Sequence, residues 1–264
     1  MTILLDVHAH LDHLKFREDL YSVVDRARKA GVKAIITSGV NHATNLEALK
    51  IAERYRDIVK CSLGLYPVDA LVEEEKNESA LLRDRGPLSV DDELKFIESK
   101  KKEIIAVGEV GLDYKFGTKH SDSQRETFLK VIELCERIKK PIIVHTRKAE
   151  EDCITVLETS RLKKVVLHCF SGNKKLIKRA ADKGWSFSIP PIIVRLQHFQ
   201  TLAEMVNINQ LLTETDCPYL SPQPGQRNEP AFVLETVKKI AEIKKFDVEE
   251  TANSIWMNYQ NMFL

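Results

Sequence analysis

Ile3-Leu4-Leu5-Asp6-Val7-His8-Ala9-His10, at the start of the chain, is an apolar run that ends in a His-x-His pair. If residues 3–7 form a strand, His8 and His10 point in the same direction, because side chains along a strand alternate between its two faces. Two imidazoles side by side at a strand end are typical ligands for one divalent metal ion such as zinc. The same pair also occurs on exposed strand edges, so the rest of the chain must decide between the two interpretations.

This run is the first of eight short apolar runs along a chain of 264 residues. The predicted strands are residues 3–7, 33–37, 58–63, 104–107, 141–144, 165–167, 186–189 and 211–213. Amphipathic stretches with a helical period lie between them, among them residues 18–30, 43–56, 121–139 and 174–183, and residues 247–264 predict a last helix that closes the barrel. Eight buried strands that alternate with helices predict an α/β protein with a (β/α)8 TIM-like barrel, as a single domain over residues 1–264, in preference to an open sheet.

The composition and charge limit the classes of function. Hydrophobic residues make up 43% of the chain, which is enough to bury a large core, and 40 Lys and Arg balance 39 Asp and Glu. A balanced charge gives no global attraction to nucleic acid or to an anionic membrane surface, so any phosphate binding must be local. Residues 71–85, which include Glu73-Glu74-Glu75, predict a solvated, charged excursion from the barrel.

The cysteines and the apolar runs indicate the cellular compartment of the protein. Five cysteines without a Cys-x-x-Cys pair argue against a disulfide framework or a structural zinc knuckle. No apolar run approaches the roughly 18 residues of a membrane-spanning helix, and charge follows the start too soon for a signal peptide. We therefore expect a cytoplasmic protein without membrane contact, as a monomer or a weak oligomer.

Side chains of the kind that bind metals follow five of the predicted strands. In barrels of this type the catalytic groups lie at the carboxyl ends of the strands. Six ligand-type residues stand at these ends: His8, His10, Glu109, His145, His168 and Asp216. The stability of a barrel does not require imidazoles at one rim, so their common placement predicts a functional centre.

Four histidines and two carboxylates suit two divalent ions that share one ligand. A carboxylate is the natural shared group, because its two oxygens can bind two ions about 3.5–4 Å apart, and we assign Glu109 to this position. The other ligands then divide into His8, His10 and Asp216 for one ion and His145 and His168 for the other. Such a pair of ions activates water at neutral pH, and Asp216 is placed to accept a proton from that water.

Six segments, taken together and in order, resemble the TatD-type metal-dependent deoxyribonucleases, a family of amidohydrolase-like barrels. They are Asp6-Val7-His8-Ala9-His10-Leu11-Asp12, Gly108-Glu109-Val110-Gly111-Leu112-Asp113-Tyr114, Pro141-Ile142-Ile143-Val144-His145-Thr146-Arg147, His168-Cys169-Phe170-Ser171-Gly172, Glu214-Thr215-Asp216-Cys217-Pro218-Tyr219-Leu220 and Arg227-Asn228-Glu229-Pro230. The resemblance covers nearly the whole chain and implies that the metal ligands are the same six residues. It further implies hydrolysis of phosphodiester bonds in DNA, often in single strands from the 3′ end, with magnesium, manganese or zinc.

One segment departs from the family pattern. The family carries Gly-x-His-Pro-His after its third strand, whereas this chain has Gly64-Leu65-Tyr66-Pro67-Val68. Tyr66 could bind substrate, by stacking on a base or donating a hydrogen bond to a phosphate, or it could be a half-buried tyrosine at the rim. The two missing histidines are outside the six-ligand set, so the departure bears on the substrate more than on the metal centre.

Three further side chains are candidates for supporting roles. Arg147 lies two residues beyond His145, and along a strand the two would point the same way. Its guanidinium would then bind a substrate phosphate or form a surface ion pair. Glu214 and Asp113 are candidates for orienting a metal ligand or a water molecule from behind.

Two other functions remain open at this point. A metal-dependent hydrolase on the same barrel could act on an amide, a lactone or another ester, and such relatives often bridge their metals with a modified lysine. Here Glu109 ends the corresponding strand, while Lys139 and Lys140 precede the strand of His145, which favours phosphodiester hydrolysis. The second alternative is a non-catalytic metal-binding module. Structural zinc sites are usually closed by four ligands and rich in cysteine, unlike this set.

Overall fold

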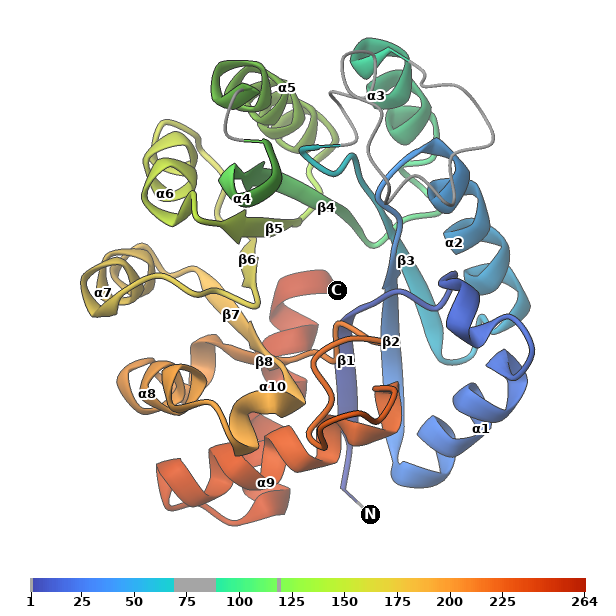
Figure 1. Cartoon of the computed structure of the whole chain (residues 1–264), viewed down its shortest axis with the longest axis vertical. Helices are drawn as coiled ribbons and strands as arrows, with labels where there is room; N and C mark the ends of the chain where they lie inside the picture. Colours follow the sequence, from blue (N-terminus) through green and yellow to red (C-terminus); the bar gives the residue numbers. More distant parts are fainter. Residues whose placement is uncertain (1, 69–88, 118–119) are drawn as a thin grey trace.

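The fold is a parallel β-barrel surrounded by helices (Figure 1). The computed structural model describes residues 2–68, 89–117 and 120–264. Successive strands are hydrogen-bonded to each other in parallel, in the order of the chain. The strands are β1 (Leu4–Ala9), β2 (Val32–Ser38), β3 (Val59–Leu63), β4 (Ala106–Asp113), β5 (Ile142–Arg147), β6 (Val165–His168), β7 (Ser186–Ile189) and β8 (Leu211–Thr213). The predicted (β/α)8 barrel is confirmed, and each predicted strand has a counterpart.

Helices lie on the outside of the barrel, between successive strands (Figure 1). The α-helices are α1 (Leu20–Ala30), α2 (His42–Arg54), α3 (Val90–Ser99), α4 (Tyr114–Gly117), α5 (Ser121–Ile138), α6 (Glu150–Glu158), α7 (Lys174–Asp182), α8 (Gln197–Met205), α9 (Val233–Lys244) and α10 (Val248–Phe263). Short 3-10 helices are η1 (Leu14–Phe16), η4 (Pro191–Val194), η5 (Ile208–Gln210) and η6 (Pro230–Phe232). The charged excursion predicted for residues 71–85 lies outside the described residues.

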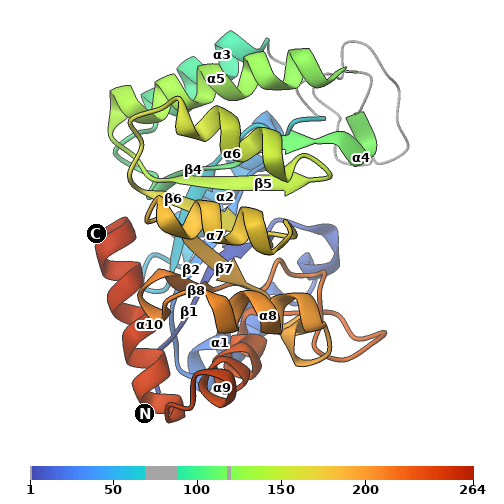
Figure 2. The ribbon, with the colours of Figure 1, turned by 90° about the vertical axis from the view of Figure 1, so that its left-hand side faces the viewer.

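The last helix, α10, packs against β1 and β8. Its first turn is capped by Asp247, whose side chain accepts a hydrogen bond from the backbone N–H of Glu250. Figure 2 shows α10 at the end of the barrel away from the strand arrowheads, so the carboxyl ends of the strands stay open for a site. Within the described ranges, no helix is long and apolar enough to cross a membrane.

The strands are buried over almost their whole length, which explains why they are visible as apolar runs in the sequence. Every residue of β1 and of β4 is buried. A parallel strand covered by helices on one face and by the barrel interior on the other is mostly apolar on both, and so shows little alternation. The polar residues that interrupt this pattern, such as His8 and Glu109, are therefore the residues that need a functional explanation.

The fourth strand differs from its predicted limits of 104–107. β4 begins at Ala106 and continues to Asp113, so Glu109 lies within the strand and not at its end. The pairing with β5 shifts in register between Val107 and Val110, and the peptide bond between Gly108 and Glu109 is cis. Gly108, Glu109 and Gly111 interrupt the apolar pattern on which the prediction relied. The pairing with β5 nevertheless continues beyond them to Asp113.

Backbone hydrogen bonds join β1 to the segment after β8 and so close the barrel beside the predicted centre. The N–H of Asp216 donates to the carbonyl of His8 at 2.9 Å, and the N–H of His10 donates to the carbonyl of Cys217 at 3.0 Å. These bonds place Asp216 directly beside the His-x-His pair, although the two segments lie at opposite ends of the chain.

Candidate metal centre

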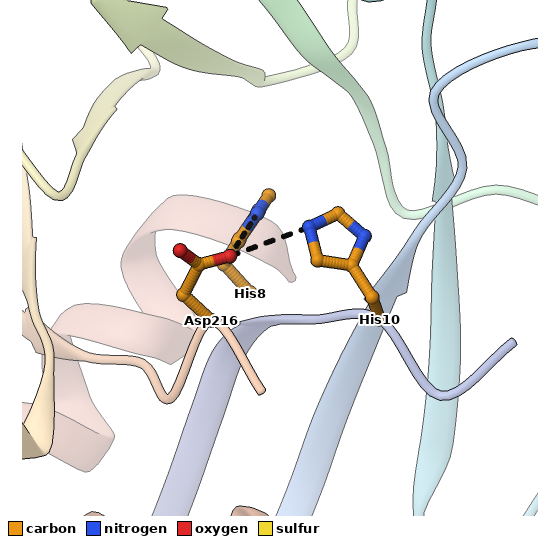
Figure 3. A group of neighbouring side chains, drawn as sticks. All are labelled: His8, His10 and Asp216. Carbon is orange, nitrogen blue, oxygen red and sulfur yellow. Dashed lines mark ion pairs between the residues drawn. The ribbon is translucent and has the colours of Figure 1, made fainter. Parts of the chain in front are cut away.

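Asp216 faces both histidines of the His-x-His pair (Figure 3). Its Oδ1 lies 3.6 Å from Nε2 of His8 and 3.3 Å from Nε2 of His10. The backbone of Asp216 is in the left-handed region at φ 53°, which aspartate tolerates better than most residues. The turn after β8 and the end of β1 therefore bring three ligand-type side chains to one point.

Glu109 lies at the middle of the six predicted ligands. Its Oε2 is 3.4 Å from Nε2 of His8 and 3.4 Å from Nε2 of His10. Its Oε1 is 2.7 Å from Nδ1 of His145 and 3.2 Å from Nε2 of His168. The two oxygens of one carboxylate thus face two different pairs of histidines, which is the arrangement expected of a shared ligand.

Two groups of donor atoms are each compact enough to hold one ion. The members of each group lie within 4.8 Å of one another, and the groups are His8, His10, Asp216 and His8, Glu109, His168. The Nε2 of His8 is buried and has no hydrogen-bond partner among the described residues. A buried polar atom without a partner is costly unless a ligand satisfies it. These imidazole and carboxylate donors therefore fit divalent ions such as zinc, manganese or magnesium.

The second group differs in one member from the expected division of ligands. We expected His145 to pair with His168, whereas the compact group contains His8. The Nδ1 of His145 is nevertheless close to the centre, at 3.2 Å from Nε2 of His168. All six predicted ligands thus lie together, and how they divide between ions stays a proposal.

The electrostatics of the centre favour a cation. Burial raises the pKa of Glu109, but the neighbouring histidines, His168 first among them, outweigh burial and hold it well below its usual range. Burial lowers the pKa values of His10 and His168, yet the adjacent carboxylates hold both well above the ordinary value. These shifts favour an ionised Glu109 and protons on His10 and His168, whereas burial lowers the pKa of His8. Metal binding would release the protons on His10 and His168.

Ser38, at the end of β2, orients the His-x-His pair, and the sequence analysis did not identify it. Its side-chain hydroxyl lies 3.1 Å from Nδ1 of His8, and its carbonyl lies 3.1 Å from Nδ1 of His10. A partner at the second ring nitrogen fixes the tautomer and the direction of a ligating imidazole. Its position at a strand end next to β1 was the only signal available in the sequence.

Glu214 supports His168 from behind. Its Oε2 lies 3.5 Å from Nδ1 of His168 and accepts a hydrogen bond from the hydroxyl of Ser188 at 2.5 Å. Its Oε1 accepts from the backbone N–H of Cys169 at 2.8 Å. The carboxylate is fully buried and held on both oxygens, so the structure places it where a positioning residue for His168 would act.

Asp6 was also missed, and it holds the segment that carries Asp216. The hydroxyl of Thr215 donates to its Oδ2 at 2.5 Å, and the N–H of Thr215 donates to its Oδ1 at 2.9 Å. Burial raises the pKa of Asp6 to about 8 despite these bonds. A polar residue inside an apolar strand was the signal that should have identified it.

Tyr66 and Asp113 contact each other behind His145. The hydroxyl of Tyr66 donates to Oδ2 of Asp113 at 2.5 Å, and the same oxygen lies 3.2 Å from Nε2 of His145. The ring of Tyr66 also packs edge-on against the imidazole of His145, with centroids 5.0 Å apart. The structure therefore directs the hydroxyl of Tyr66 to Asp113 and not toward open solvent.

We expect Tyr66→Phe to weaken metal binding by about 10- to 100-fold, because Asp113 would lose a donor that orients it toward His145. Titration calorimetry of the metal-stripped protein with zinc or manganese measures the change. Tyr55→Phe is the matched control, since the buried hydroxyl of Tyr55 has no hydrogen-bond partner in the part of the chain that the structure describes. Equal metal affinity in the two variants would show that Tyr66 does not act through Asp113.

Arg147 lies at the exposed edge of the centre. It ends β5 opposite Asp113 of β4, and its guanidinium stacks over the ring of Phe116 at 5.0 Å from the ring centroid. Its positive charge lowers the pKa of Tyr66, against a larger opposite effect of burial. Among the described residues it forms no ion pair with a carboxylate, so the surface ion pair considered from the sequence is not found.

A profile of the family described as "TatD related DNase" matches residues 5–264. The chain belongs to this family. The human Deoxyribonuclease TATDN3 is 33% identical over 264 residues, which cover 98% of this chain and 94% of that protein. The 3′-5′ ssDNA/RNA exonuclease TatD of Erwinia amylovora is 30% identical over 272 residues, which cover 98% and 99% of the two chains.

A solved TatD homologue shares the fold. The crystal structure of YJJV from Escherichia coli superposes with a TM-score of 0.85 at 23% identity and covers 98% of this chain and 97% of its own. The family profile and the two relatives confirm the TatD resemblance inferred from the motifs, and the six motif segments all fall within the matched range. In this TatD-family barrel, the ligand-type residues of those motifs lie together around Glu109.

Proposed function

We propose that this TatD-family protein is a divalent-metal-dependent deoxyribonuclease that shortens single-stranded DNA from its 3′ end, with two ions at the centre. The observation that carries the proposal is the position of Glu109, whose two oxygens face two different pairs of histidines. Membership of the TatD related DNase family supports the reaction. The name of the Erwinia relative, a 3′-5′ ssDNA/RNA exonuclease, supports the strand preference and the direction.

The six predicted ligands would hold the ions, and the two carboxylates have different further roles. Bound divalent ions would supply hydroxide at neutral pH and neutralise charge on the phosphate. Glu109 is almost fully enclosed, with 6% of its side chain exposed, whereas 18% of the side chain of Asp216 is exposed. Asp216 can therefore reach an attacking water and accept its proton, while Glu109 holds the surrounding histidines in place.

Arg147 would bind the phosphate of the substrate. Its guanidinium is exposed and lies on the strand of His145, at the open end of the barrel. The planar fork of five N–H donors matches the oxygens of a phosphate. Tyr66 would act through Asp113, by the hydrogen bond that its hydroxyl donates to that carboxylate.

We further propose a single catalytic domain over residues 1–264 that works as a monomer or a weak oligomer. We also propose that it works in the cytoplasm. The five cysteines support this location, because all of them are free thiols, as is usual in a reducing compartment.

The test of the proposed function is cleavage of single-stranded DNA by metal-stripped protein to which magnesium, manganese or zinc is returned in turn. With a 5′ label we expect a metal-dependent ladder of shortening products, and with a 3′ label we expect early release of a labelled mononucleotide. A blunt duplex of the same sequence is the control and should be cleaved more slowly. No cleavage with any of the three metals, while metal stays bound, would contradict the proposal and favour an amide, lactone or ester hydrolase.

We expect the affinity for single-stranded DNA to depend only weakly on salt, because the net charge of the chain is +1. Each phosphate contact to a single strand contributes about −0.7 to the slope of log affinity against log salt. Two or three contacts give a slope of about −1.4 to −2.1, and Arg147→Ala should make it shallower by about 0.7.

Arg137→Ala is the control for the salt measurement. The guanidinium of Arg137 is paired with Glu98 on the outside of the barrel, at 2.8 Å. This variant should leave the slope unchanged. A wild-type slope much steeper than −2, or an unchanged slope in Arg147→Ala, would show that the phosphate contacts lie elsewhere.

A further inference from the structure

Phe116 is an exposed aromatic residue beside the metal centre. It is 54% exposed and lies in α4, the short helix that directly follows β4 (Figures 1 and 2). Asp113, three residues earlier, contacts His145 of the centre. A single exposed aromatic side chain has no special meaning on a protein surface. Its meaning here depends on what holds it in place and on what lies beside it.

The turn that carries Phe116 is held by a buried side chain. Gln124 is fully buried, and its amide donates to the carbonyls of Asp113 and Gly117, each at 3.0 Å. Its amide oxygen accepts from the N–H of Asp113 at 2.8 Å. Gln124 thus clamps both ends of the short turn, so the ring of Phe116 is presented to solvent from a fixed backbone.

Asp113 links this turn to the metal centre. Its Oδ1 accepts hydrogen bonds from the N–H groups of Lys115 at 2.8 Å and Phe116 at 3.0 Å. Its Oδ2 faces Nε2 of His145. One carboxylate therefore sets both the position of Phe116 and the orientation of His145, and the ring has a defined place relative to the centre.

Two cationic groups lie near the ring of Phe116. The guanidinium of Arg147 lies over it at 5.0 Å from the centroid, and Nζ of Lys115 lies at 5.4 Å. Arg147 has no carboxylate partner within the described part of the chain, so its charge is available to an anionic ligand. A flat apolar surface next to unpaired positive charge is suited to a ligand that combines an aromatic ring with a phosphate.

We infer that Phe116 and Arg147 form a stacking subsite for one unpaired nucleotide of the DNA strand, next to the bond that is cleaved. The base stacks on the ring of Phe116, and the guanidinium of Arg147 binds the adjoining phosphate. This inference rests on the proposed function and adds a strand-selecting site to it. An unpaired base can turn onto the ring, whereas a base inside a duplex has both faces covered by its neighbours and its edge held by its pair. Stacking does not depend on the identity of the base, so the subsite selects single strands without selecting sequence.

The first experiment measures binding of a short oligothymidylate with phosphorothioate linkages and a 5′ fluorophore to the magnesium-loaded protein, by fluorescence anisotropy. We expect Phe116→Ala to weaken binding by about 5- to 150-fold, the range for loss of one stacked base. Phe116→Trp should bind at least as tightly as the wild type. Phe116→Leu keeps an apolar side chain without a ring and should lose affinity while the fold persists.

Phe246→Ala is the matched control. Phe246 is another exposed phenylalanine, 40% exposed, and it lies between α9 and α10, away from α4. This variant should bind the oligonucleotide like the wild type. Wild-type affinity in Phe116→Leu and Phe116→Ala would overturn the subsite.

The decisive experiment removes the base as well as the ring. A series of oligonucleotides, each with one abasic nucleotide, is bound to the wild type and to Phe116→Ala. At one position, removing the base should weaken binding to the wild type as much as Phe116→Ala weakens binding of the intact strand. Removing that same base should not weaken binding to Phe116→Ala any further. If, at every position, the affinity loss from the abasic nucleotide and the affinity loss from Phe116→Ala multiply as independent effects, the inference is overturned.

The outcomes separate the subsite from the proposed function. Coupling means that the effects of the abasic nucleotide and of Phe116→Ala on binding are not independent. Cleavage of unmodified DNA without coupling at any position would refute the subsite but not the proposed nuclease activity. Coupling at one position without cleavage under any metal would support the subsite and refute the nuclease. No binding of the oligonucleotide by the wild type would overturn both.

Discussion

Glu109→Gln is expected to reduce phosphodiester hydrolysis by at least about 1,000-fold, equivalent to about 4 kcal/mol of transition-state stabilisation. The substitution keeps the size of the side chain and removes its charge. The two oxygens of Glu109 face His8 and His10 on one side and His145 and His168 on the other. A neutral amide cannot serve both sides as a shared anionic ligand, so metal binding should fall together with turnover.

The fold should survive this substitution. The histidines around Glu109 would lose a buried counter-charge, and they can respond by giving up their protons. Circular dichroism and the urea midpoint would establish that the variant is folded. Titration with manganese would then measure the lost metal affinity independently of turnover.

Glu93→Gln is the matched control for Glu109→Gln. Glu93 is also a buried carboxylate, 1% exposed, but it is bonded to Asn45 and His42 between α2 and α3. We expect this variant to lose some stability and to keep its turnover per folded molecule. Near-normal hydrolysis by metal-stripped Glu109→Gln would refute the metal-dependent mechanism.

Gly64→Ala is expected to destabilise the protein by about 3 kcal/mol or more and to abolish metal binding. An added Cβ would lie 2.5 Å from the carbonyl carbon of Gly108, and closer still to the backbone N and O of Glu109. Asn45 holds the backbone of Gly64 from the other side, with bonds of 3.0 Å to its N–H and 2.8 Å to its carbonyl. These bonds prevent the backbone after β3 from moving away from β4. The added Cβ would therefore displace the backbone of Glu109.

Urea unfolding and metal titration measure the two effects separately. Gly225→Ala is the control, because Gly225 has φ 77° and nothing within 4 Å of an added Cβ. This control should cost about 1–2 kcal/mol through backbone strain alone and leave metal binding intact. If Gly64→Ala matches the control in both measurements, the close approach of β3 to Glu109 does not maintain the centre.

Local patterns were enough to predict the architecture. β8 has the limits that a buried apolar run predicts, residues 211–213. β7 also has its predicted limits, residues 186–189, although two of its four residues are serines. The pattern failed at β4, where Gly108, Glu109 and Gly111 interrupt it while the backbone ladder continues. A strand end that is defined by hydrogen bonds to a neighbour is not visible in the strand's own residues.

The candidate ligands were also accessible from sequence, for a chemical reason. His8, His145 and His168 are polar residues placed where apolar runs end, and the stability of a barrel does not require them there. The residues that orient them were harder to find. Ser38 has no distinctive pattern. Asp6 stands out as a polar residue in an apolar strand, but its partner Thr215 lies 209 positions away in the chain.

Residue types and their periodicity along the chain determined the barrel and the six candidate ligands, because both are local properties of consecutive residues. The tertiary structure decided which oxygen of Glu109 faces which histidines, that Tyr66 bonds to Asp113, and that Phe116 stands exposed beside Arg147. These contacts depend on the register between neighbouring strands and on the closure of β8 against β1. Register and closure are set by packing between distant segments, and no single segment of the sequence carries that information.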